Sequence, residues 1–221
     1  MDRTRLYPLP LAARLLLFLS CAPKETKVLL RPSEALGAVL AEEAAPLAGL
    51  KKQVAIISAD ASWGAGSTAE EAFKKFMKGR GFTVVTAKAA NLGNPMRRGP
   101  MGLKAADFLE AIDQSAGAGA IVSFAGAPVF SAGEADRVPA VHPPVLVVAT
   151  ASLGNVPGLW SDPVQLARLL EAKTIDLAVI DGGDPAAQPA GKADAGTRFS
   201  LRTIASSAGR IEQSRVREPD K

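Results

Sequence analysis

Five short apolar runs, separated by segments with helical periodicity, constrain the fold of this chain more than any other feature. The runs are VAII, FTVV, AIVSF, VLVVA and TIDLAVI, which begin at residues 54, 82, 120, 145 and 174. Each is apolar at consecutive positions, which is typical of strands buried on both faces of a parallel sheet. We therefore predict an α/β fold, a three-layer sandwich with a mainly parallel sheet of about five or six strands. RFSLRTIA, from residue 198, alternates like a strand added at a sheet edge.

The helix after the first apolar run is the best defined in the sequence. Apolar residues recur at three- and four-residue steps through AEEAFKKFM, residues 69–77. Ser67 and Glu70 have capping-box spacing, which predicts that the helix begins near residue 67. Gly79 or Gly81 is positioned to end it.

Three further helices are predicted. One begins at Ser33 and is disturbed by Pro46, after a short extended segment VLLRP. A second covers residues 104–115, and a third has Asp162 as its N-cap and Pro163 at its first helical position. In contrast, SAGEADRVPAVHPP, residues 131–144, is too rich in proline to form a full crossover helix.

The first residues have the order of a secretory signal. Arg3, Arg5 and Arg14 precede the apolar stretch of residues 15–19, which is shorter than the about 20 residues that span a bilayer. Phe-Leu-Ser-Cys, ending at Cys21, resembles a bacterial lipobox, whose cysteine is diacylated. We therefore expect a lipid-anchored protein on the periplasmic side of the bacterial cell envelope. An uncleaved anchor, a plain signal, or an unexported chain with a buried cysteine are the alternatives.

This interpretation divides the chain into four parts. Residues 1–20 are the expected lipoprotein-type signal and residues 21–32 a tether. Residues 33–206 form a single α/β domain, and residues 207–221 a polar tail that we expect to be disordered.

Composition argues against nucleic-acid binding. The net charge is only +4, the basic residues are scattered, and aromatic residues make up 5% of the chain. Catalysis is also disfavoured, because His142 is the only histidine and no nucleophile motif is present. We predict no cofactor and no metal.

Residues 58–68, SADASWGAGST, lie where an α/β fold binds ligands, beyond the carboxyl end of the first strand. GAGSTA has the G-x-G-x-x-A spacing of a dinucleotide loop, but its first glycine comes too late after the strand. The hydroxyls of Ser67 and Thr68, together with helix N–H groups, are able to bind the phosphate of FMN as in flavodoxin, although no aromatic pair is evident for the flavin. A flavodoxin-like strand order is accordingly the alternative fold.

The segment from residue 51 to residue 85 resembles the second lobe of type I periplasmic binding proteins, the leucine and branched-chain amino acid receptor type of ABC-transporter substrate-binding proteins. Asp60, Trp63 and Gly64 match the acidic, aromatic and glycine positions between the family's strand and helix. ADFLEAIDQSAGAGAIVSF, from residue 105, continues the likeness. The resemblance implies that Trp63 faces a small polar solute. The candidate ligand-binding residues are Asp60, Ser62, Trp63, Ser67, Thr68 and Ser152.

Because the resemblance covers one lobe only, binding requires a shallow crevice, a homodimer or an envelope protein partner. The leading hypothesis is an exported, membrane-tethered solute-binding or sensory module. The alternative is a non-catalytic structural or assembly lipoprotein of the envelope that acts through protein contacts. A flavodoxin-like FMN-binding protein is the third.

Overall fold

The computed structural model describes residues 24–59, 65–93, 102–149, 163–181, 201–207 and 210–215, and the side chains of residues 33–59, 68–93, 102–149 and 164–180. The strands are β1 (Gln53–Ala59), β2 (Thr83–Ala90), β3 (Leu103–Lys104), β4 (Ala120–Ser123), β5 (Pro128–Val129), β6 (Val145–Ala149), β7 (Leu177–Asp181), β8 (Leu201–Ser207) and β9 (Arg210–Arg215). The helices are α2 (Lys24–Ala48), α3 (Ala65–Gly79), α4 (Ala105–Gln114) and α5 (Pro163–Glu171), with short 3-10 helices η1 (Gly49–Lys51) and η3 (Ala135–Arg137).

One sheet with the order β2-β1-β4-β6-β7-β8-β9 runs through the fold, and β3 pairs with β5 in a separate small sheet. The five strands β2, β1, β4, β6 and β7 are parallel, as predicted, and each of the five apolar runs lies in or overlaps one of them. β8 joins β7 antiparallel, so RFSLRTIA contains a strand that is added to the sheet as predicted, but this strand is not at the edge. The sheet has seven strands rather than five or six because β9 pairs antiparallel with β8.

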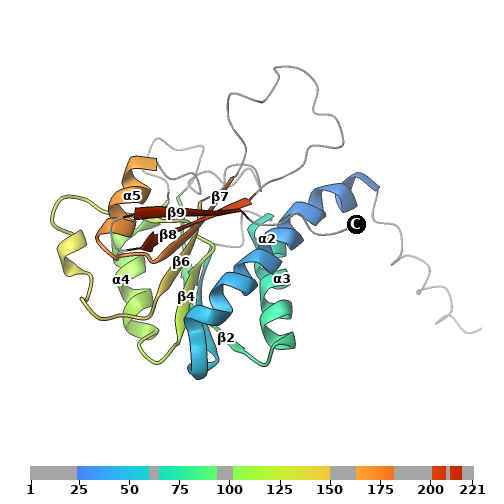
Figure 1. The fold of residues 1–221 in the computed structure, drawn as a ribbon, viewed down its shortest axis with the longest axis horizontal. Helices are drawn as coiled ribbons and strands as arrows, with labels where there is room; N and C mark the ends of the chain where they lie inside the picture. The colour runs from blue at the N-terminus through green and yellow to red at the C-terminus, as the bar shows by residue number, and fades with distance from the viewer. Residues whose placement is uncertain are drawn as a thin grey trace, which may run out of the picture.

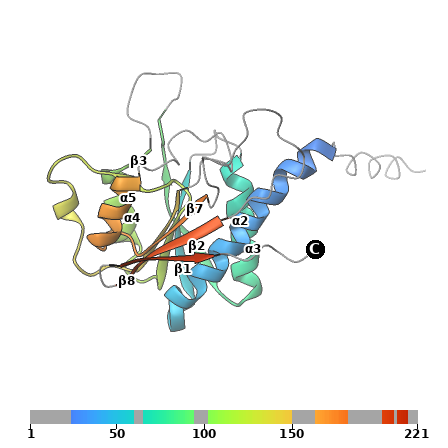
Figure 2. The same ribbon diagram turned by 45° about the horizontal axis from the view of Figure 1, so that its top comes forward.

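Helices cover the two faces of the sheet, as Figures 1 and 2 show, with α2 and α3 on one face and α4 and α5 on the other. Alternate residues of each strand enter different cores. Val54 and Ile56 of β1 pack with α2 and α3, whereas Ala55 and Ile57 belong to the core with α4 and α5. Burial on both faces explains why the apolar runs are continuous rather than alternating.

The connection between β4 and β6 contains β5 and the short η3 but no crossover helix, as its proline content predicts. Apolar side chains of this segment fill part of the core that such a helix would cover. Phe130 packs edge-on against Phe108 of α4, with ring centroids 5.9 Å apart, and Val138 also packs against this core.

Helices α2 and α3 pack closely because Gly37 has no side chain. A Cβ atom there would lie 2.5 Å from the carbonyl oxygen of Ala69 and 2.8 Å from the backbone nitrogen of Phe73. Both helices run antiparallel to β1, from the carboxyl edge of the sheet to its amino edge. α2 ends just before the start of β1, and α3 begins after the end of β1. They are therefore parallel neighbours on one face.

The end of α3 is fixed by a Schellman motif. Gly81 has φ +78°, its N–H donates to the carbonyl of Lys78, and the Phe82 N–H donates to the carbonyl of Met77. The predicted role of Gly81 is thus explained by its backbone geometry. The predicted capping box is wrong, because α3 begins at Ala65 and Glu70 instead forms an ion pair with Lys74.

Helix α2 is longer than the sequence suggests. It begins at Lys24, so VLLRP is helical rather than extended, and most of the segment expected to be a tether lies in α2. Pro46 lies in its last turn, where it removes an N–H that would bond the carbonyl of residue 42. Arg80 reaches this part of α2, since its Nη1 donates to the carbonyl of Ala41 at 3.0 Å and its Nη2 lies 3.7 Å from a carboxylate oxygen of Glu42.

At the other end of the chain, β9 occupies residues that the sequence assigns to a polar tail. Among the helices that the structure describes, none combines the length and the apolar character needed to cross a membrane. The division into signal, tether, domain and tail stays a prediction.

Candidate functional site

The strand order reverses between β1 and β4. The chain leaves β1 through α3 towards β2 on one side, and it leaves β4 towards β6 on the other side. Where two such connections diverge, the carboxyl ends of the two strands are not covered by either connection, and a crevice forms between them. Here those ends are Ala59 of β1 and Ser123 of β4.

A buried turn after β4 forms the floor of this region. Ser123 is fully buried, and its Oγ donates to the carbonyl of Gly126 at 2.7 Å. Gly126 has φ +86°, a left-handed conformation that favours glycine. The N–H of Phe124 donates to the carbonyl of Ile57 at 2.9 Å, which fastens the turn to β1. The turn at the carboxyl end of β4 is therefore held by hydrogen bonds within itself and to β1.

The rim of the same edge is built from β3, β5 and the first turn of α5. Leu103 pairs with Pro128 and Lys104 with Val129 in the small parallel sheet. The side-chain amide of Gln165 donates to the carbonyl of Pro128 at 3.1 Å, so α5 is held against β5.

The segment between β2 and β3 is also fixed at its two ends. The N–H of Gly102 donates to the carbonyl of Leu92 at 3.1 Å, and the Gly93 N–H donates to Oδ1 of Asn91 at 2.9 Å. The side chains of Leu92 and Leu103 are buried in the core with α4. These contacts bring the two described ends of the segment together, at residues 91–93 and 102.

A bulge in β2 changes the face of the sheet on which the following side chains lie. Ile56 pairs with Thr86 but Ile57 pairs with Lys88, so Ala87 is left without a partner on β1. Because successive side chains of a strand point to opposite faces, one unpaired residue moves every later side chain to the other face of the sheet. Lys88 thereby lies on the face of α4, instead of on the face of α2 and α3 that regular alternation would give it.

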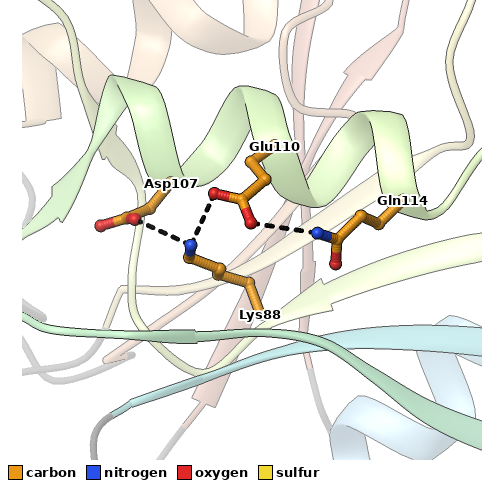
Figure 3. Close-up of polar contacts among 4 residues, drawn as sticks. All are labelled: Lys88, Asp107, Glu110 and Gln114. Carbon is orange, nitrogen blue, oxygen red and sulfur yellow. Dashed lines mark hydrogen bonds and ion pairs between the residues drawn. The ribbon is translucent and has the colours of Figure 1, made fainter.

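Lys88 is held on that face by two carboxylates of α4, as Figure 3 shows. Its Nζ lies 2.6 Å from an oxygen of Glu110 and 3.4 Å from an oxygen of Asp107. Gln114 donates to the other oxygen of Glu110 at 3.0 Å. The hydrogen bond to Glu110 raises the pKa of Lys88, and Asp107 adds to the shift. The cluster ties the edge strand to α4, and both of its carboxylates share the single charge of the lysine.

The described part of the carboxyl edge offers hydroxyl and backbone groups for hydrogen bonding. Thr68 is half-buried in the first turns of α3, and Ser58 is half-buried near the end of β1. No group of three His, Cys, Asp or Glu side chains able to hold a metal occurs among the described residues. Such an edge is suited to hydrogen bonding with a polar molecule.

The structure tests the predicted site residues unevenly. Thr68 lies in α3 at the carboxyl edge, and Ser67 lies in the backbone of the first turn of α3. The others, including the predicted lipidation site, fall outside the described residues; they are Asp60, Ser62, Trp63, Ser152 and Cys21. Their roles stay predictions.

Sequence reasoning missed two features of this edge. The Ser123 turn had a usable signal, namely a serine at the end of an apolar run with a glycine three residues later. The cluster around Lys88 had none, because a bulge that redirects one lysine leaves no mark in the periodicity of TVVTAKAA.

No protein-family model matches this chain, and no curated protein matches it in sequence. Among solved structures, it is similar to a sugar ABC transport system substrate-binding protein from Bordetella parapertussis 12822, with 15% identity and a TM-score of 0.41. The match covers 69% of this chain and 41% of the other, so the chain spans less than half the length of that protein. The fold class stated above follows from the strand order and the helix layers, independently of this likeness. The leucine-receptor type stays a prediction.

Proposed function

We propose that this chain is a binding or sensory module for a small polar solute, which it holds at the carboxyl edge of the sheet between β1 and β4. The observation that carries this proposal is the reversal of strand order between these two strands. In open α/β sheets, ligands bind in the crevice outside the strand ends at such a reversal.

Two local features support the same position. The floor is fixed by the bond from Ser123 to Gly126 and by the bond from Phe124 to Ile57, so little ordering is needed when a ligand binds. In addition, α3 begins at Ala65 and directs its free N–H groups towards this edge. Residues 60–64 connect β1 to α3, which is the reason for proposing Asp60, Ser62 and Trp63 as ligand contacts.

We further propose that the module is tethered to a membrane of the bacterial envelope through a lipid on Cys21. The basic residues, the short apolar stretch and the lipobox-like FLSC support this part of the proposal. Growth with radiolabelled palmitate followed by isolation of the protein tests it, with Cys21→Ser as the unlabelled control.

Native mass spectrometry of the protein, purified without refolding, tests solute binding. We expect a retained solute, or one gained from a panel of sugars, amino acids and FMN, that is lost in Trp63→Ala. Phe76→Ala is a suitable control, because Phe76 is a 43% exposed aromatic residue on α3 in the half nearer the amino edge. Equal binding by wild type and Trp63→Ala would exclude Trp63 from the site. A flavin in the protein would favour the flavodoxin-like alternative.

A protein-contact role is the second candidate, and one observation favours it. Val129 of β5 is 45% exposed and Val164 of α5 is 57% exposed, on two elements joined by the bond from Gln165 to Pro128. Charged substitutions of both valines that leave solute binding intact but abolish complex formation in envelope extracts would support this role.

A further inference from the structure

The edge strand β2 lacks two features that commonly prevent an edge from pairing with another strand. It lies at one end of the seven-stranded sheet and has eight residues, more than any other strand that the structure describes. Natural edge strands are usually short, or they carry proline or an outward-pointing lysine. β2 has no proline, and its single lysine, Lys88, is held by carboxylates of α4. Thr83, Val85 and Thr86 are exposed, so this stretch of the strand is open to solvent.

Two residues of β2 direct their backbone groups to the open side. The N–H of Thr83 donates to the carbonyl of Lys52, so the backbone of Thr83 bonds towards β1. Alternate residues of a strand bond to opposite sides, so Val85 also bonds towards β1. The N–H and C=O groups of Val84 and Thr86 therefore point outwards, where a further strand is able to pair with them.

This open stretch is limited at both of its ends. The Phe82 N–H already donates to the carbonyl of Met77, in the turn that ends α3. At the other end, the bulge at Ala87 interrupts regular pairing. A partner strand accordingly meets the outward groups of Val84 and Thr86 and no regular continuation of them.

We propose that β2 pairs antiparallel with β2 of a second copy of this chain, about a twofold axis at Val85. Val84 of each copy then lies opposite Thr86 of the other, and each pair exchanges both of its N–H···O=C bonds. An axis at Val84 would instead set Thr86 against Phe82, whose N–H is already used. An axis at Thr86 would set Val84 against Lys88, which lies beyond the bulge.

The side chain at the axis fits this register. Val85 pairs with Ala55 of β1, so it lies on the face of α4, and it is 36% exposed. Across the axis, the two Val85 residues form a pair without direct hydrogen bonds, in which the Cα atoms are only about 4.5 Å apart. Two exposed apolar side chains would thereby cover each other, which stabilises a cross-strand pair.

The charges of α3 are complementary about the same axis. From the turn after α3, three residues of β2 lead to Val85, over about 10 Å at 3.3 Å per residue. The same length of α3, counted back from Gly79, reaches about residue 72. An axis at this level lies midway between Glu70 and Lys74. Antiparallel α3 helices would therefore bring Glu70 of one copy level with Lys74 of the other.

The two α3 helices would also be close enough for these charges to meet. α3 contacts both β1 and β2, so it lies over the gap between them. With a strand spacing of about 4.8 Å, the helices of the two copies would be about 10 Å apart, the distance of directly packed helices. Glu70 and Lys74 lie on the side of α3 opposite to Ala72, which faces Gly37 of α2. The ion pair between Glu70 and Lys74 would thus join its counterpart in the second copy.

This arrangement makes one continuous sheet through both copies. The twofold axis is perpendicular to the sheet and reverses the strand direction, so the carboxyl edges of the two copies face opposite ways. Each copy keeps its own crevice between β1 and β4, and the pairing does not depend on the proposed solute site.

Disulfide cross-linking tests the register. Val85→Cys and Thr83→Cys are made in the full chain with Cys21→Ser, which removes the only native cysteine. Both positions are exposed on the same face of β2. Across the axis, the Cα atoms at position 85 lie within disulfide range, whereas those at position 83 lie about 14 Å apart. We expect mild oxidation to give a linked dimer from Val85→Cys and about tenfold less from Thr83→Cys.

Sedimentation velocity over a concentration series tests the dimer itself in the same Cys21→Ser chain. We expect Val85→Lys to weaken dimerisation about tenfold, because it sets two like charges opposite each other, and Thr83→Lys to have little effect. Solute binding should be retained in Val85→Lys. A chain that remains monomeric, equal cross-linking at both positions, or a dimer that Val85→Lys leaves unchanged would each overturn the inference, whatever the result for solute binding.

Discussion

Substitution of Gly37 by alanine tests the close packing of α2 on α3. Two opposite terms determine the result. Alanine is favoured over glycine inside a helix by about 1 kcal/mol. Against this, the new methyl group would lie 2.5 Å from the Ala69 carbonyl oxygen, 2.7 Å from the Ala72 Cβ and 2.8 Å from the Phe73 backbone nitrogen. Two of these atoms belong to the backbone of α3 and cannot move without shifting the helix.

Overpacking of this kind typically costs about 1–3 kcal/mol, and a clash with backbone belongs in the upper part of that range. After the gain in helix propensity, Gly37→Ala is expected to lower the free energy of unfolding by about 1–2 kcal/mol. For a domain of this size, the midpoint of thermal unfolding should fall by about 2–8 °C.

Urea unfolding followed by circular dichroism measures this difference. Gly79→Ala is the matched control, because no atom lies within 4 Å of a Cβ at that helical position. The control should leave stability unchanged or raise it by up to about 1 kcal/mol. A Gly37→Ala protein as stable as wild type would refute the close approach of the two helices.

Three further changes test the site and its supports. Ser123→Ala removes the donor to the Gly126 carbonyl and should lower the free energy of unfolding by about 1–3 kcal/mol in urea. Ser115→Ala should be neutral or stabilising, because the buried Ser115 hydroxyl has no hydrogen-bond partner. Similar losses of stability in both variants would contradict this assignment. Lys88→Met should reduce stability at neutral pH and low salt. Since the pKa of Lys88 is raised on folding, its contribution is present below the ordinary lysine value of about 10.4 and is lost as pH rises through the folded value. The difference between the two proteins should therefore shrink in alkaline solution and in 1 M salt, and a difference that stays constant would show that packing, not charge, is responsible.

The sequence predicts the strands of this fold well where consecutive residues of a strand are all buried. A strand such as β6, buried on both faces, produces a continuous apolar run, and each of the five runs lies in or overlaps a strand. α3 begins two residues before the position that the capping-box pattern predicts, because that pattern at Ser67 also fits a helix already under way.

Other features depend on contacts that periodicity does not report. α2 continues through Pro32 and Pro46, where local preference alone indicates a break. The partners of Lys88 depend on a bulge at Ala87, and β9 depends on pairing with β8. The candidate site was located by the general rule for strand ends, but its floor at Ser123 became evident only from the turn geometry.

Hydrogen–deuterium exchange of the protein with its retained solute, compared with the same protein after the solute is stripped, tests the central claim most directly. The account predicts slower exchange in peptides covering the β1–α3 connection and the turn after β4, residues 57–69 and 123–129. Peptides at the amino edge, such as residues 114–119, should be unchanged. Protection confined to the amino edge, or spread evenly over the chain, would contradict a binding site at the reversal of strand order.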